Sequence, residues 1–115
     1  MTQSLRIVVA GLAGLYPIGG VLWDYLQYVV GLARMGHDVY YFEDTWQWPY
    51  EPVQRRFIDA PDFSLDSINR FLEDHGLSSR WRYVHLHERV HGLRDEPWRH
   101  VAATADLFIN VSGAS

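Results

Sequence analysis

A strand–loop–helix–strand pattern at the start of the chain constrains the fold more than any other feature. Residues 5–10 are apolar apart from Arg6, which is typical of a strand buried on both faces of a parallel sheet. After a glycine-rich loop at 11–20, residues 21–35 carry apolar side chains at helical spacing. Gly36 is the expected helix stop, and a second strand should begin near Asp38. Strands joined through a helix in this way are parallel, with a right-handed crossover.

The rest of the chain continues the alternation of helices and strands. Residues 45–62 are expected to form an irregular loop, and a helix capped by Ser64 should run to Gly76. Strands are expected within 80–87 and 106–113, with a helix between them that starts at Asp95 or Glu96. The order predicts an α/β fold with a parallel sheet of about four strands. We expect residues 1–115 to be one domain, an amino-terminal piece of a larger protein, because the last strand has no helix or strand after it.

Composition narrows the function classes. The net charge is -4 and no basic stripe is present, which argues against a nucleic-acid partner. The absence of cysteine excludes disulfides, thiol catalysis and thiolate metal sites. All ten basic residues are arginine, which excludes a Schiff-base lysine and a Walker-type phosphate lysine. No apolar stretch is long enough for a membrane span and no signal-peptide pattern is complete, so a cytoplasmic domain is expected.

The glycine loop lies where α/β proteins commonly bind phosphates or sugar hydroxyls. A helix amino terminus presents unpaired N–H groups there, and Gly19 and Gly20 let a ligand approach the backbone. Glu43, at the end of the second strand, stands where a ribose-binding acid would be expected. The fingerprint G-x-G-x-x-G is absent, so dinucleotide binding is only an alternative, and Glu43 can also be a plain solvated acid.

A longer pattern carries a family resemblance. The glycine pair, the helix after it and the run LARMGHDVYYFE at 32–43 resemble the start of GT-B glycosyltransferases, and ADLFINVSG at 105–113 is similar to a later strand of the same domain. The resemblance covers residues 5–43 and 105–113 and is thin between them. The matching residues of the first part are Gly19, Gly20, Leu32, Ala33, Gly36, His37 and Val39.

The resemblance implies a Rossmann-like three-layer sandwich, half of a GT-B fold. It implies the acceptor-side domain of an enzyme that moves a sugar from a nucleotide-sugar to an unknown acceptor, with a separate carboxy-terminal domain for the donor. The nucleotide-sugar would be a co-substrate, and no other cofactor is expected. No residue matches a catalytic-base motif, so the base stays unassigned and this chain alone should be inactive. The rival hypothesis is a binding or regulatory module without chemistry, and a homodimer through an exposed sheet edge is a further expectation.

Four more residues are candidates for substrate binding. Trp46 and Trp48 can stack on sugar rings, although packing of the loop is the commoner role of such side chains. Ser112 and Gly113 follow the last strand at its carboxyl end, the usual ligand side of an open α/β sheet. An ordinary strand-to-loop turn explains that pair equally well.

The segment HERVH at 87–91 spells the zinc-peptidase motif H-E-x-x-H. That chemistry needs both histidines on one face of a helix. The preceding residues alternate like a strand and Gly92 follows at once, so we expect no helix here and no metal site.

Overall fold

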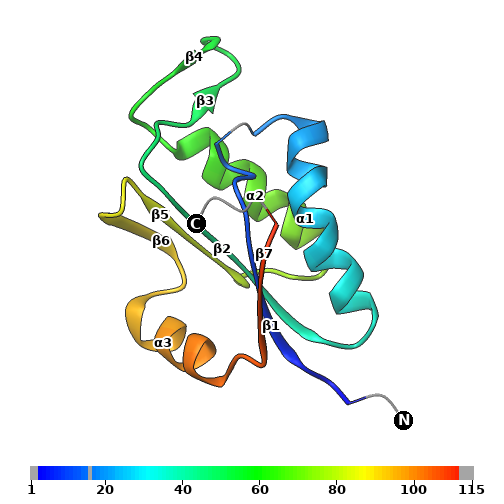
Figure 1. The fold of residues 1–115 in the computed structure, drawn as a ribbon. Helices are drawn as coiled ribbons and strands as arrows, with labels where there is room; N and C mark the ends of the chain where they lie inside the picture. The colour runs from blue at the N-terminus through cyan, green and yellow to red at the C-terminus, as the bar shows by residue number, and fades with distance from the viewer. Residues whose placement is uncertain (1–2, 16, 112–115) are drawn as a thin grey trace.

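The computed structural model describes residues 3–15 and 17–111 and shows an α/β fold built on one mixed sheet (Figure 1). The strand order is β6-β5-β2-β1-β7, so the first strand lies inside the sheet and the last strand lies beside it. The five strands are β1 (Arg6–Ala10), β2 (Asp38–Thr45), β5 (Trp81–His85), β6 (Arg89–Gly92) and β7 (Leu107–Asn110).

The four strands predicted from sequence are β1, β2, β5 and β7, and they are parallel to one another, as expected. The prediction of a wholly parallel sheet of about four strands is wrong, because a fifth strand, β6, pairs antiparallel with β5. The strand expected within 80–87 ends at His85. A tight turn then reverses the chain, with Leu86 and His87 at φ 53° and 57°, and the chain returns along β5.

Helices lie on both sides of the sheet. Helices α1 (Gly19–Arg34) and α2 (Asp62–Asp74) pack on one face, where Leu26 and Ile68 join Tyr41 in the buried core. Side chains alternate along a strand, so Phe42 points to the opposite face. There it stacks on Trp98 of helix α3 (Asp95–Thr104), with ring centroids 4.8 Å apart.

The loop expected over 45–62 is partly ordered as a small hairpin. Strand β2 extends to Thr45, and β3 (Tyr50–Glu51) then pairs antiparallel with β4 (Arg56–Phe57). In Figure 1 this hairpin stands away from the main sheet, beyond the end where β2 finishes.

Local contacts explain one of the predicted boundaries and correct another. Gly36 has φ +93° directly after α1, which confirms the predicted helix stop, and the backbone N–H of Leu5 donates to Nδ1 of His37 beside it. The predicted cap at Ser64 is wrong, since α2 begins at Asp62 with Pro61 as its N-cap. Ser64 is buried, and its hydroxyl donates to the carbonyl oxygen of Gly14 instead.

One glycine offers a simple gain in stability. Gly31 lies within the exposed side of α1, and a Cβ built on it meets nothing within 4 Å. Gly31→Ala should raise the free energy of unfolding by about 1 kcal/mol, because alanine loses less backbone entropy in a helix. Thermal unfolding followed by circular dichroism should show a melting temperature higher by about 5 °C. An unchanged or lower melting temperature would contradict the placement of Gly31.

Candidate functional site

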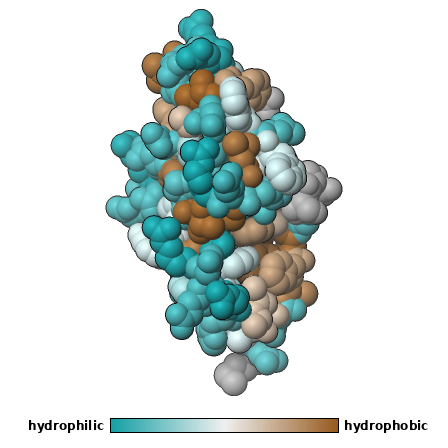
Figure 2. Space-filling model, turned by 90° about the vertical axis from the view of Figure 1, so that its left-hand side faces the viewer, coloured by the Kyte–Doolittle hydropathy of each residue, from teal (hydrophilic) through white to brown (hydrophobic). Residues whose placement is uncertain are grey.

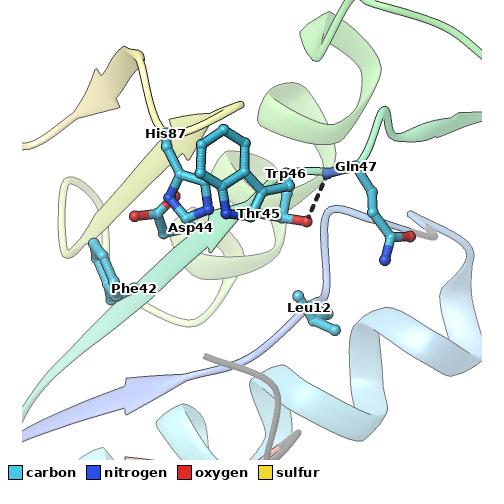
Figure 3. A pocket seen from close by; sticks show the side chains of 7 residues that line it. All are labelled: Leu12, Phe42, Asp44, Thr45, Trp46, Gln47 and His87. Carbon is cyan, nitrogen blue, oxygen red and sulfur yellow. Dashed lines mark hydrogen bonds and ion pairs between the residues drawn. The ribbon is translucent and has the colours of Figure 1, made fainter.

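The loops that follow β1, β2 and β5 meet at the carboxyl edge of the sheet, where open α/β sheets bind ligands. A pocket of about 380 Å³ opens there (Figure 3). Phe42 and Asp44 on its wall belong to the face that carries α3, and that helix covers Phe42 through Trp98. The pocket is lined by Leu12, Phe42, Asp44, Thr45, Trp46, Gln47 and His87.

An acid and an imidazole face each other in this pocket. Nδ1 of His87 lies 2.5 Å from Oδ1 of Asp44, and both side chains are about one-third exposed. The indole of Trp46 lies against the imidazole, with centroids 3.9 Å apart and planes at 56° (Figure 3). Trp46 is 75% exposed, so most of its surface remains open to a ligand.

The local sequence explains how these groups meet. Alternation along β2 places Phe42 and Asp44 on one face and Tyr41 and Glu43 on the other. The β5–β6 turn holds His87 over the end of β2, and the N–H of Glu88 closes this turn by donating to the carbonyl of His85, 3.0 Å away. Positive φ at the turn fixes the direction in which the imidazole leaves the backbone.

Glu43 lies on the other face and is 1% exposed. Its Oε1 accepts hydrogen bonds from the hydroxyl of Tyr41, at 2.5 Å, and from the N–H of Gly14, at 2.9 Å. Burial raises the pKa of Glu43 to about 7, against the lowering effect of these donors. The same burial, with the charge of Glu43 nearby, raises the pKa of Tyr41 well above its usual value. Glu43 therefore fastens the β1–α1 loop to the sheet and does not face the pocket.

The glycine loop has two parts with different surroundings. Gly14 is packed tightly, since an added Cβ would lie 2.7 Å from Cε2 of Tyr83 and 3.1 Å from Oε2 of Glu43. Gly19 and Gly20 are exposed in the first turn of α1, where an added Cβ would meet nothing within 4 Å. That helix end has no side-chain cap and no acidic residue in its first turn.

The remaining predicted site residues do not all lie at the pocket. Trp48 is 49% exposed in the same loop as Trp46 but does not line the pocket. Ser112 and Gly113 lie outside the described residues. Of the predicted site residues that the structure describes, only Trp46 lines the pocket.

The segment HERVH at 87–91 was expected not to form a helix, and the structure agrees. His87 is in the turn and His91 is on β6. His85 is fully buried, and its Nε2 lies 2.6 Å from Oδ1 of Asp59, which Arg89 also contacts at 2.7 Å. Within residues 3–15 and 17–111, no group of three or more histidine, cysteine or acidic side chains is placed to hold a metal ion.

Sequence reasoning missed the acid–imidazole pair of the pocket, Asp44 and His87. Asp44 follows Glu43 directly, and alternation along β2 could have assigned the two acids to opposite faces. The sequence pointed to His87 only as a candidate metal ligand, because no sequence signal placed the reversal at Leu86.

In the part of the chain that the structure describes, no helix is both long and apolar enough to cross a membrane. Comparison of the chain with protein-family models, with curated proteins and with solved structures finds no match.

Proposed function

We propose that this chain is the acceptor-side, Rossmann-like domain of a sugar-transferring enzyme of the GT-B type, and that the pocket at its sheet edge holds a sugar ring. The observation that carries the proposal is the open indole of Trp46 beside the Asp44–His87 pair. A sugar ring has apolar C–H faces and a rim of hydroxyls, and this pocket offers partners for both.

Different lining residues would contact the apolar face and the hydroxyls of a sugar ring. The indole of Trp46 gives a flat apolar surface for the C–H face of a ring. The carboxylate of Asp44, the imidazole of His87 and the amide of Gln47 supply acceptors and donors for hydroxyls. The hydroxyl of Thr45 already accepts the N–H of Gln47, at 3.1 Å, and so shapes the wall (Figure 3).

The acid–imidazole pair also suggests a chemical role. Because Nδ1 of His87 lies 2.5 Å from Oδ1 of Asp44, Nε2 would be the nitrogen that accepts a proton from an acceptor hydroxyl. The carboxylate would orient the ring and stabilise the imidazolium that forms. In this proposal His87 is the general base and Asp44 its positioning residue.

The open end of α1 fits the same proposal. Its N–H groups at Gly19 and Gly20 have no acid beside them in the first turn, which suits the phosphates of a nucleotide-sugar co-substrate. A ribose contact from Glu43 is not part of the proposal, because its Oε1 is held by the chain itself.

Two tryptophans in one loop provide a matched test of sugar binding. Trp46→Ala should weaken binding of a monosaccharide or nucleotide-sugar about tenfold, since a stacking surface is lost. Trp48→Ala removes an exposed indole outside the pocket and should change the Kd less than twofold. Saturation-transfer NMR with a panel of sugars gives the ligand, and titration gives the Kd. Failure of every sugar at millimolar concentration, or equal losses in both variants, would refute the proposal.

The enzyme proposal and its rival, a binding module without chemistry, differ in the role they give His87. If the chain is part of an enzyme, His87→Gln should abolish sugar transfer while sugar still binds, measured in the longest polypeptide that contains this chain. Sugar binding without transfer from any nucleotide-sugar would favour the module.

A further inference from the structure

We propose that the β3–β4 hairpin is a membrane-docking element that binds the headgroup region of an anionic lipid surface. The inference is independent of the sugar-binding proposal, because the hairpin residues that carry it do not line the pocket.

The first observation is a set of exposed apolar side chains on a small projecting element. Val53 is 79% exposed at the tip, and Phe57 on β4 is 44% exposed. Trp48, which leads into β3, is 49% exposed. Figure 2 shows hydrophobic and hydrophilic residues mixed at the end of the molecule that corresponds in height to the hairpin of Figure 1. A projecting element with exposed apolar side chains can enter the headgroup layer without any helix that spans the bilayer.

The second observation is the charge at the tip. Arg55 and Arg56 are adjacent and exposed there, although the whole chain carries a net charge of -4. A carboxylate oxygen of Glu51 accepts the N–H of Gln54 at 2.5 Å and keeps its negative charge, so residues 51–56 carry a net charge of +1. The guanidinium of Arg56 donates to Oε1 of Gln54 at 2.9 Å, and Asp59 forms an ion pair with Arg89 beside its contact with His85. Basic residues next to tryptophan and phenylalanine are the combination that binds an anionic lipid surface.

The third observation is that the base of the hairpin is fastened while its tip is exposed. The N–H of Tyr50 donates to the carbonyl of Leu15 at 2.8 Å, and the N–H of Ile58 donates to the carbonyl of Pro49 at 3.1 Å. The Asp59 contacts with His85 and Arg89 hold the returning chain against β5 and β6. A tip held on a fixed base presents its side chains in one direction, which lowers the ordering cost of binding to a surface.

Docking would also orient the pocket. Trp46 and Gln47 belong both to the pocket wall and to the short segment that links β2 to the hairpin. A lipid-bound tip therefore places the pocket mouth near the membrane surface.

Co-sedimentation with vesicles tests the proposal, using equal parts phosphatidylglycerol and phosphatidylcholine against phosphatidylcholine alone. The chain should bind the mixed vesicles, and binding should weaken as salt is raised. Each arginine near an anionic surface strengthens binding about fivefold, so Arg55→Gln with Arg56→Gln should lower the partition coefficient about 30-fold. Val53→Ser with Phe57→Ser should lower binding to a similar extent.

The far end of α1 supplies the matched control. Arg34 is the last residue of α1 and Met35 follows it, and both are exposed like the tip residues. This end of α1 lies away from the carboxyl edge of the sheet and from the hairpin (Figure 1). Arg34→Gln with Met35→Ser should leave vesicle binding unchanged, and circular dichroism should show all variants folded. No binding by the unchanged chain, or equal losses in the control, would overturn the proposal. So would size-exclusion data in which the tip variants abolish a dimer and vesicles have no effect, since the occupant would then be a second copy.

Discussion

Gly92→Ala should lower the free energy of unfolding by about 4 kcal/mol, the largest effect we expect from one methyl group in this chain. Gly92 ends β6 with φ +81°, and an added Cβ would lie 2.4 Å from the backbone oxygen of Trp81. That oxygen also accepts the N–H of Leu93, so it cannot move away without losing a hydrogen bond. A domain typically has a free energy of unfolding of roughly 5–15 kcal/mol, so Gly92→Ala should remove a large share of the stability. Chemical denaturation followed by tryptophan fluorescence measures the change.

Gly76→Ala separates the two causes of this loss. Gly76 has φ +74°, but an added Cβ there would meet nothing within 4 Å. Gly76→Ala should therefore lower the free energy of unfolding only through backbone strain, by about 1 kcal/mol. Equal losses at the two positions would mean that the close approach to Trp81 does not exist. Because the β5–β6 hairpin carries His87, a partly folded Gly92→Ala protein should also lose sugar binding in the pocket.

The second large effect is a dependence of stability on pH that comes from Glu43. Its pKa is about 7 in the folded chain and near the ordinary 4.5 when the chain is unfolded, so the folded state binds more protons between these values. Stability from this group is complete below pH 4.5 and is lost as pH rises to 7, by about 3 kcal/mol in total. The Oε2 atom of Glu43 is buried without a partner among the described residues, which suits a proton there at low pH.

Glu43→Gln should remove this dependence, because the amide does not titrate and its oxygen can still accept from Gly14 and Tyr41. The quantity to plot is the difference in unfolding free energy between the two proteins from pH 4.5 to 8, since other groups then cancel. The exposed Glu73→Gln is the control and should leave the slope unchanged. A difference that stays flat with pH would show that the Glu43 carboxyl is not buried as described.

Elements with a strong local signal were predictable from sequence. The apolar runs of β1, β2 and β7 and the glycine stop after α1 rest on neighbouring residues alone, and the structure has them within a few positions. The reversal at Leu86 was not predictable, because two non-glycine residues adopt positive φ there and no Asn-Gly or similar pair marks a hairpin. Tertiary contacts of β5 and β6 override that local preference.

The candidate site was predictable only in part, for a related reason. Trp46 stood out as an aromatic residue in a long loop, whereas the pairing of Asp44 with His87 depends on the unpredicted hairpin. Glu43 stood out as an acid at a strand end, and its burial depends on the path of the loop around Gly14, which no spacing rule reveals. Gly19 and Gly20 were expected to end the loop before the helix, whereas the structure has them as the first two residues of α1. Their contact with a ligand remains a prediction.

The position of β1 has a consequence for synthesis of the protein. Ile7 pairs with Val39 on one side and with Leu107 on the other, so one neighbour follows soon after β1 and the other lies 100 positions further along the chain. A nascent chain on the ribosome must keep one long side of β1 unpaired until β7 emerges. The domain can therefore complete its folding only near the end of translation of this region, and such long-range closure is intrinsically slow.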